Sequence, residues 1–295
     1  MFYHLGLIGY PLQHSFSPQI HRAFLTMRGL QGSYELFPIA NDDQKDVAFR
    51  KIIQKIKVGD LNGVNVTIPH KQNIIPFLDG LSGDAEIIGA VNTLYYSNGQ
   101  VLGENTDVIG FLRDVSRLID LDTTGRALIF GAGGAARAVA VGLLKHGWHV
   151  DIVARRFEQA QQLIEDIQAR IHKLLSVPLS TLRAFDLSQI DNVYRDLGET
   201  LSLIVNCTPV GMIGKESMQF FPPRIQINPK VCVYDLVYNP SETDFLTEAK
   251  QLGLRGRNGM GMLIEQAACS FEIWTGISLV GPLPDPLIIH HEDSK

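Results

Sequence analysis

Residues 127–136 read Ala-Leu-Ile-Phe-Gly-Ala-Gly-Gly-Ala-Ala, an apolar run that leads directly into a glycine-rich turn. The run predicts a buried strand, and a helical pattern follows the turn from Ala138 to His146. In a dinucleotide-binding unit of this order, Gly131 permits the tight turn, Gly133 lets a pyrophosphate approach the backbone, and Ala136 allows helix and strand to pack closely. Glycine turns alone are common at strand ends, but strand, turn and helix together predict a Rossmann-type domain.

The residues after the next predicted strand, 150–154, bear on which nicotinamide dinucleotide is bound. NAD-binding proteins usually carry an acidic residue there, which holds the ribose 2′-hydroxyl. This chain has Arg155 and Arg156 instead. Two guanidinium groups can hold a 2′-phosphate by paired hydrogen bonds and can stack on adenine, so NADP is the expected cofactor. The alternative is a solvated basic turn in which Glu158 neutralises one arginine.

Short apolar runs alternate with helical patterns along the chain, which is typical of α/β domains with mostly parallel sheets. A chain of 295 residues with 45% hydrophobic content is long enough for two cores. We expect a boundary near Asn105, and the last helical pattern, 262–274, could return to the first domain. The other predicted strands lie at residues 5–8, 34–38, 63–67, 91–95, 203–206 and 231–236, and the other predicted helices at 17–28, 48–55 and 107–121.

Composition narrows the class of partner. The formal net charge of −5 and the isoelectric point near 6.0 argue against a nucleic acid or a membrane surface, and favour a small-molecule ligand. The apolar N-terminus is too short for a signal peptide or a membrane span, which favours a cytoplasmic protein. Cys207, Cys232 and Cys269 form no CxxC, and the nine histidines are scattered, so neither disulfides nor a metal are expected. The oligomeric state, monomer or homodimer, stays open.

The segment Asn65-Val66-Thr67-Ile68-Pro69-His70-Lys71 delivers a hydroxyl and an amine to the end of a predicted strand. Pro69 ends the strand because it lacks a ladder donor, so Lys71 falls just past the strand end. In open α/β sheets ligands bind outside such strand ends. The alternative is a solvated loop lysine, which is common unless the lysine has a partner.

Four more segments carry polar groups whose role is ambiguous when each is taken alone. Ser15 and Ser17 lie at the start of a predicted helix, where they could cap its amides or donate to a substrate anion. The remaining segments could each form a turn or a cap: Ala90-Val91-Asn92-Thr93, Asn105-Thr106-Asp107 and Gly259-Met260-Gly261-Met262-Leu263-Ile264-Glu265-Gln266.

The order of these motifs closely resembles the signature of the shikimate dehydrogenase family over nearly the whole chain. The matching segments, in chain order, are HSxSP, NVTIPHK, AVNT, NTD, GAGGAARA, NCTPVGM, YDLVY and GMLIEQAA. The resemblance implies reversible, NADPH-dependent reduction of 3-dehydroshikimate to shikimate, a step toward chorismate and the aromatic amino acids. It also implies a substrate domain of residues 1–105 plus 255–295, a Rossmann domain of residues 106–254 inserted between them, and an active site in the cleft between the domains.

The resemblance also implies roles for single residues. Lys71 and Asp107 are the expected catalytic residues. The expected substrate-binding residues are Ser15 and Ser17 at the carboxylate, Thr67, Asn92 and Gln266 around the ring hydroxyls, and Tyr238 closing the carboxylate end. The expected cofactor-binding residues are Gly131, Gly133, Gly134 and Ala135 at the pyrophosphate turn, Arg155 and Arg156 at the adenosine end, and Gly259 and Met262 near the nicotinamide.

The reaction needs a hydride from the cofactor and a proton for the alkoxide that develops at the carbonyl. An ammonium beside that oxygen stabilises its charge and can donate the proton, and a carboxylate can orient the amine. Lys71 and Asp107 fit these two tasks as one coupled site, so the base is not assigned to either residue alone.

Two residues depart from the family pattern, and two other functions have to be weighed. Arg156 stands where a Thr is usual, which leaves the margin of NADP over NAD open. Cys207 replaces a small hydroxyl residue near the expected nicotinamide; packing is its expected role, and redox sensitivity would require a lowered thiol pKa. A dual-specificity quinate/shikimate dehydrogenase shares most of these residues, although Ser17 rather than Thr favours shikimate. A non-catalytic dinucleotide sensor is disfavoured by the intact Lys71, Asp107 and Gln266.

Overall fold

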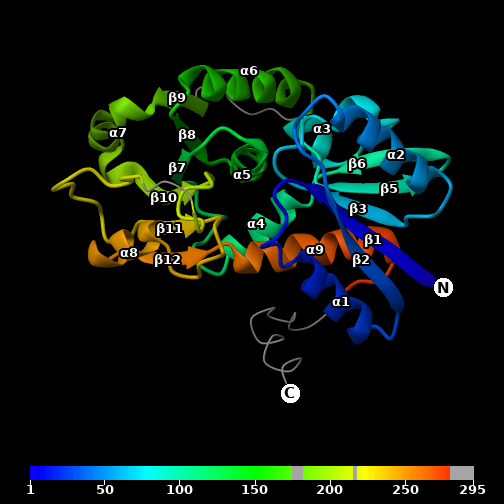
Figure 1. Cartoon of the computed structure of the whole chain (residues 1–295). Coiled ribbons are helices and arrows are strands. Elements are labelled where there is room, and N and C mark those ends of the chain that lie inside the picture. Colours follow the sequence, from blue (N-terminus) through cyan, green and yellow to red (C-terminus); the bar gives the residue numbers. More distant parts are fainter. Residues whose placement is uncertain (175–181, 215–217, 280–295) are drawn as a thin grey trace. The chain divides into compact units, whose positions relative to one another are not determined.

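The computed structural model describes residues 1–174, 182–214 and 218–279, which Figure 1 traces in colour. Its contacts divide the chain into two compact units. Met1–Gly110 and Leu263–Lys295 form the first unit, and Phe111–Met262 form the second. Residues 280–295, which the sequence analysis assigned to the first domain, lie outside the described residues.

The first unit contains a mixed six-stranded sheet in the order β2-β1-β3-β5-β6-β4. Strand β1 is parallel to β2 and β3, β5 is antiparallel to β3 and β6, and β4 is parallel to β6. The strands are β1 (Phe2–Gly9), β2 (Gln31–Pro38), β3 (Gly63–Val66), β4 (Gly80–Leu81), β5 (Thr93–Ser97) and β6 (Gln100–Glu104). β1 and β3 are therefore parallel neighbours whose carboxyl ends meet at one edge of the sheet.

The hairpin of β5 and β6 was not predicted from the sequence. Ser97 pairs with Gln100, which leaves Asn98 and Gly99 as a two-residue loop with φ of 50° and 82°. An Asn-Gly pair between two apolar runs is the strongest short-range signal for this kind of turn. The hairpin introduces the antiparallel strands of a sheet that we expected to be mostly parallel.

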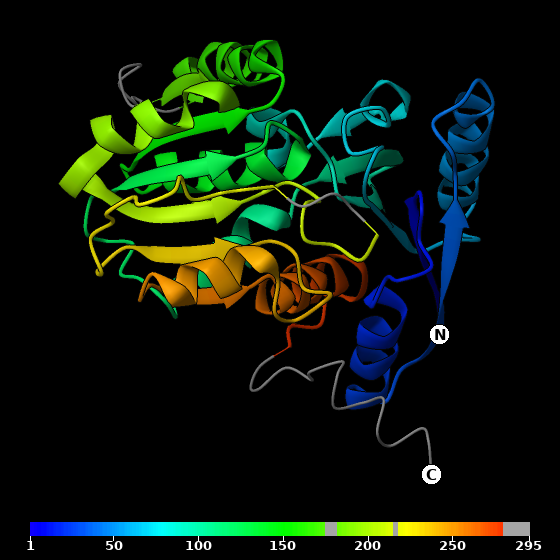
Figure 2. The same ribbon diagram turned by 60° about the vertical axis from the view of Figure 1, so that its left-hand side comes forward.

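Helices cover both faces of the first sheet (Figure 2). On one face, α2 (Lys45–Lys57) buries Phe49, Ile53 and Ile56 at helical spacing in a core shared with Ile8 and Val64. On the other face lie α1 (Ser17–Met27) and α9 (Met260–Thr275), whose rings of Phe24 and Phe271 meet edge to face at 5.7 Å. The shorter helical elements are η1 (Ile75–Phe77) and α3 (Asp84–Ile88).

Helix α4 (Asp107–Val115) begins in the first unit and ends in the second. It begins as predicted but ends at Val115, short of the predicted range 107–121. Its last turn is anchored to the second sheet, because Asp114 accepts hydrogen bonds from the Tyr234 hydroxyl at 2.7 Å and from Arg257 Nε at 2.8 Å. The prediction was too long because the pattern after Val115 forms turns rather than helix.

The second unit contains an all-parallel sheet in the order β12-β11-β10-β7-β8-β9. The strands are β7 (Arg126–Phe130), β8 (His149–Ala154), β9 (Leu182–Asp186), β10 (Leu201–Asn206), β11 (Cys232–Asp235) and β12 (Arg255–Asn258). Numbered from β7, this is the 3-2-1-4-5-6 order of the Rossmann fold. The order reverses between β7 and β10, and dinucleotides bind at that point. The predicted α/β class and the Rossmann-type domain are confirmed.

The helices of the second unit follow its strands in βαβ order. They are α5 (Gly134–Lys145), α6 (Phe157–Leu174), α7 (Ile190–Leu197) and α8 (Asp244–Gln251), with short turns η3 (Leu187–Gln189) and η4 (Gly198–Thr200). Phe130, Phe220 and Phe245 lie within its core. Within the described ranges, no helix combines the length and the apolar character that a membrane span requires.

Candidate active site

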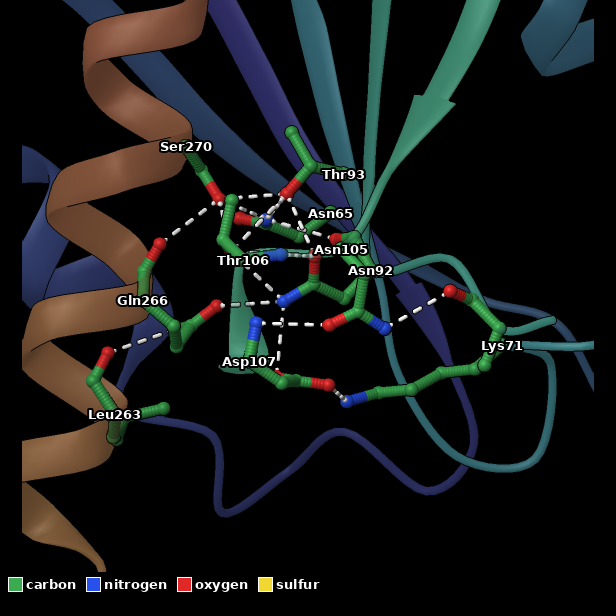
Figure 3. A network of polar contacts seen from close by, with 11 residues as sticks. Asn65, Lys71, Asn92, Thr93, Asn105, Thr106, Asp107, Leu263, Gln266 and Ser270 are labelled. Carbon is green, nitrogen blue, oxygen red and sulfur yellow. Dashed lines mark hydrogen bonds and ion pairs between the residues drawn. The ribbon is translucent and has the colours of Figure 1, made fainter. Parts of the chain in front are cut away.

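Lys71 and Asp107 form an ion pair in the first unit, with Nζ donating to Oδ2 at 2.5 Å (Figure 3). Lys71 lies in the turn after β3, and its carbonyl accepts the Val91 N–H at 2.7 Å, which holds that turn against the residues before β5. Asp107 is the first residue of α4. The side chains are 18% and 6% exposed respectively, so the pair lies at the edge of the buried interior rather than within it. The predicted partner of Lys71 is present.

Asn92 fixes the second carboxylate oxygen of Asp107. Its Nδ2 donates to Asp107 Oδ1 and to Thr106 Oγ1, both at 2.9 Å, and its Oδ1 accepts the Thr106 N–H at 2.8 Å. Asn105 Oδ1 also accepts the Asp107 backbone N–H at 3.0 Å. The carboxylate is therefore held on both oxygens before any ligand binds, and its free rotation is removed.

Helix α9 closes this network from its own buried face. Gln266 Oε1 accepts from Asn92 at 3.2 Å, while its Nε2 donates to the Leu263 carbonyl at 2.8 Å. Ser270, one turn further along, lies 2.7 Å from the Thr93 hydroxyl. Positions four apart share one face of a helix, so both side chains reach the same cluster.

A second group of polar side chains continues the network to β2 and α1. Asn65 Nδ2 donates to Ser270 Oγ at 3.0 Å, and Asn65 Oδ1 accepts the Tyr34 hydroxyl at 2.8 Å. The ring of His21 stacks on Tyr34 with centroids 4.5 Å apart. Burial lowers the pKa of His21 to about 3, with the Asn65 side chain partly opposing, so the imidazole is neutral at working pH. Burial also raises the pKa of Tyr34, while its hydrogen bond with Ser17 opposes that rise.

The two serines lie after β1 and Thr67 lies after β3. Ser15 Oγ accepts the Ser17 N–H at 3.3 Å, but the N-cap residue of α1 is Phe16, which makes no side-chain cap hydrogen bond in the described part of the chain. Ser17 is buried, and the Thr67 backbone N–H donates to the Ile8 carbonyl at 2.8 Å. These residues share the strand-end edge with Lys71. Tyr238, by contrast, belongs to the second unit, where burial raises its pKa.

The glycine turn of the second unit combines a positive φ at Gly131 with an uncapped helix start at Gly133. Gly131 has φ of 107°, and a Cβ there would lie 3.1 Å from Thr208 Cγ2, so only glycine fits. Gly133 is the N-cap of α5; no described atom lies within 4 Å of its Cβ position, and α5 has no side-chain cap in the described structure. Gly134 and Ala135 form the first turn. The first-turn amides therefore offer donors for an anion.

The remaining predicted cofactor residues are divided between exposed and buried positions. Arg155 and Arg156 are exposed just past β8, at the carboxyl edge where the glycine turn also lies. Gly259 and Met262 lie at the start of α9, and Met262 is buried. A Cβ on Gly259 would lie 2.3 Å from the Leu236 carbonyl oxygen, so close packing within the protein already requires glycine there.

Cys207 follows β10 and touches the glycine turn. Burial, with a smaller contribution from Asp235, raises the pKa of its thiol well above the usual value. A redox role would require the opposite shift, since thiolate is the reactive form. The packing interpretation is therefore favoured. In the three described segments, no three His, Cys, Asp or Glu side chains gather as a metal site.

Five residues of the network were not assigned a role from the sequence: Asn65, Thr93, Asn105, Thr106 and Ser270. Four of them stand beside assigned residues in the motifs NVT, AVNT and NTD, so their signal was position within a motif. Ser270 had a weaker signal, its spacing of four from Gln266.

A lysine–carboxylate pair in one unit and a Rossmann dinucleotide turn in the other together define a class, the nicotinamide-dependent dehydrogenases of small hydroxylated substrates. Family models give the particular family. A shikimate dehydrogenase substrate binding domain matches residues 7–94, and a shikimate 5′-dehydrogenase C-terminal domain matches residues 259–278.

Individual relatives agree over most of the chain. A Methanococcus maripaludis protein described as shikimate dehydrogenase (NADP(+)) is 39% identical over 273 residues, 92% of each chain. The Thermus thermophilus shikimate 5-dehydrogenase in complex with NADP(H) and shikimate is 33% identical with a TM-score of 0.76, covering 98% of this chain and 97% of that one. A quinate dehydrogenase from Corynebacterium glutamicum in complex with NAD is 28% identical with a TM-score of 0.80, covering 99% and 98%. The chain belongs to the shikimate dehydrogenase family, which confirms the resemblance.

Proposed function

We propose that this protein catalyses the reversible, NADPH-dependent reduction of 3-dehydroshikimate to shikimate, on the route to chorismate and the aromatic amino acids. The observation that carries the proposal is the Lys71–Asp107 pair, whose carboxylate is held by Asn92 on one oxygen and by Lys71 on the other. A sensor would have no need of such a fixed ammonium. Membership of the shikimate dehydrogenase family supports 3-dehydroshikimate and shikimate as the substrate pair.

The chemistry requires a proton at the substrate oxygen. When bound, NADPH supplies a hydride to the carbonyl carbon. Lys71 places an ammonium at the oxygen where negative charge develops and donates a proton to it, while Asp107 holds the ammonium in position. In the oxidative direction the same pair accepts the proton of the hydroxyl. Because Nζ and Oδ2 share one short hydrogen bond, the pair acts as a coupled acid–base unit.

The substrate is held mainly by the first unit in this proposal. Ser15 and Ser17 bind the carboxylate at the start of α1, where the orphan amides of the helix favour an anion. Thr67, Asn92 and Gln266 contact the ring hydroxyls, and Tyr238 of the second unit closes the carboxylate end. The buried bonds of Asn92 and Gln266 support this role, because their side chains are oriented before the substrate arrives.

The second unit binds NADP in this proposal. The uncapped start of α5 fits a pyrophosphate, held by Gly131, Gly133, Gly134 and Ala135. Arg155 and Arg156 hold the 2′-phosphate, which their exposed guanidinium groups can reach. Gly259 and Met262 lie on the nicotinamide side. The relatives described as NADP(+)-dependent support this cofactor.

Initial rates at 340 nm test the proposal, with shikimate or quinate as substrate and NADP or NAD as cofactor. A preference of at least about tenfold for shikimate with NADP, about 1.4 kcal/mol of transition-state stabilisation, is the expected result. No turnover with any pair would contradict it. A titration of NADPH binding in the same preparation separates a missing catalyst from an unfolded protein.

The likeness to the quinate dehydrogenase keeps one second candidate, a dual-specificity enzyme. Comparable kcat/KM values for quinate and shikimate, or for NAD and NADP, would favour it. The proposal further places the enzyme in the cytoplasm as a monomer or homodimer. Light scattering on the eluting protein distinguishes the two assemblies.

A further inference from the structure

Asp235 is a buried carboxylate at the carboxyl end of β11, outside every role assigned above. It is 0% exposed. Its Oδ1 accepts from Asn206 Nδ2 at 2.9 Å and from the Val237 N–H at 3.0 Å, and its Oδ2 accepts the Thr243 hydroxyl at 2.6 Å. All three donors are neutral, and no Lys, Arg or His of the described ranges pairs with this carboxylate.

Through Asn206, Asp235 sets the loop that follows β10. Because the carboxylate takes the amide Nδ2, the amide oxygen faces that loop and accepts the Thr208 N–H at 3.0 Å and its hydroxyl at 2.7 Å. Asn206 Nδ2 also donates to the Val210 carbonyl at 3.1 Å. Residues 207 and 208 in turn pack on Gly131, within 3.4 Å of its Cβ position. The carboxylate thus determines which loop conformation meets the glycine turn.

Asp235 also sets the loop that follows β11. Its bond to the Val237 N–H fixes the backbone just before Tyr238. The Val237 carbonyl accepts the Gly259 N–H at 3.3 Å, and the Leu236 carbonyl lies against the Gly259 Cβ position. Thr243, held by Oδ2, is the N-cap of α8 and lies beside Gly211. One carboxylate therefore joins both loops and the start of a helix.

We propose that Asp235 is a positioning residue that holds the loops after β10 and β11 in the arrangement required by the nicotinamide half of the bound dinucleotide. This inference rests on the proposed NADP site. A carboxylate suits this task, because it sets the orientation of the Asn206 amide and can take three donors at once. An amide at 235 can keep two of these bonds if its oxygen faces Asn206 and Val237 and its NH2 donates to Thr243. The methyl group of an alanine at 235 keeps none of these hydrogen bonds.

Asp235→Ala and Asp235→Asn in the full chain test the proposal. The alanine variant is expected to lose at least about tenfold in kcat and about tenfold in NADP affinity, while binding of shikimate alone falls by less than NADP affinity does, because the first unit mainly holds the substrate. The asparagine variant is expected to recover most of both losses. The emission of NADPH bound to each variant is a readout without turnover, since a nicotinamide in a loosened site is expected to lose its enhanced fluorescence.

Asp151→Asn is the matched control, because Asp151 is a buried carboxylate of the same sheet that pairs with Arg126 and Arg183. It is expected to lower stability but to leave kcat and bound NADPH emission within twofold. If the control loses as much as Asp235→Ala, or if a folded Asp235→Ala keeps full emission and kcat, the proposal is wrong. If Asp235→Ala does not fold, Thr243→Val replaces it, with an expected loss of about threefold in kcat and emission; no loss overturns the proposal.

The outcome stays distinct from that of the proposed function. A wild-type protein without turnover would end the proposed reaction. The NADPH emission and affinity of wild type, Asp235→Ala and Asp151→Asn would still decide the role of Asp235.

Discussion

The polar centres around Asn92 in the first unit and Asp235 in the second are built from the same kinds of side chain, namely amides, hydroxyls and carboxylates. They differ in where the charged groups lie. Around Asn92, the interior contains amides and hydroxyls, and the ionised groups form a pair at the edge. Around Asp235, a single carboxylate lies fully inside and is surrounded by neutral donors.

The difference separates two tasks. Proton transfer needs charges that a substrate can reach, so Lys71 and Asp107 keep some exposure and have each other as partners. Holding loops needs only an acceptor, and its burial costs stability because desolvation disfavours the charged form. Burial accordingly raises the pKa of Asp235 to about 6, with the bonds from Thr243, Val237 and Asn206 opposing the rise.

Removing the ammonium of Lys71 is expected to have the largest effect on catalysis. Lys71→Ala should lower kcat about 10³-fold, within the range of general acid–base catalysis, and change KM for shikimate only a few-fold. Steady-state rates with saturating NADP measure both. Lys57→Ala, which removes a surface ion pair with Asp79, is the control and should change kcat less than twofold. An unchanged kcat in Lys71→Ala would take the ammonium out of the chemistry.

Breaking the interior of the same centre should cost stability as well as rate. Asn92→Ala leaves the Thr106 N–H and the second Asp107 oxygen without their partner, and each buried unsatisfied group costs about 1–3 kcal/mol. We expect a loss of about 3 kcal/mol in the free energy of unfolding, measured with urea. The exposed Asn192→Ala should stay within about 0.5 kcal/mol. Equal stability of the two variants would mean that these hydrogen bonds of Asn92 contribute nothing measurable to the free energy of unfolding.

The exposed arginines of the second unit should show a smaller and more selective effect. Arg155→Ala is expected to lower kcat/KM for NADP about tenfold and to leave the value for NAD nearly unchanged, because the 2′-phosphate that the arginine binds is present only in NADP. Arg156→Ala, measured alongside, shows how the two arginines share that phosphate. Arg195→Ala on α7 is the control. A parallel fall with both dinucleotides would assign Arg155 to folding instead.

The smallest effects concern the pH dependence of the free energy of unfolding. His21 in the first unit and Asp235 in the second should change it in opposite directions. The pKa of His21 is lowered to about 3, so its contribution to stability is complete above pH 6.5 and is lost as the pH falls below that value. The raised pKa of Asp235 acts oppositely, since the cost of its charge is complete above pH 6 and disappears toward pH 4.

Unfolding free energies at several pH values separate the two groups. Between pH 6.5 and 5.5 wild type should lose about 1 kcal/mol relative to His21→Gln. Between pH 7 and 5 it should gain about 1 kcal/mol relative to Asp235→Asn. Parallel curves for either pair would show that the group titrates alike in the folded and unfolded chains.

Local signals in the sequence were sufficient for the dinucleotide turn of the second unit. The strand, glycine turn and helix at residues 127–146 depend on neighbours a few positions apart, so the pattern predicted them directly. Other elements of this unit have only weak signals in the sequence. Strand β12, Arg255–Asn258, is polar and was missed because it is an edge strand recognised only by its pairing with β11.

The sequence by itself determined the Rossmann turn, the arginines that favour NADP and, through ordered motifs, the family and the residues expected to act. Tertiary structure alone decided how those residues are held: Ser270 meets Asn65 across 205 positions of chain, and Asp235 joins two loops and a helix. The physical reason is range. Backbone preferences and short motifs depend on adjacent residues, whereas the direction of a buried hydrogen bond depends on which distant segments the packed core brings together.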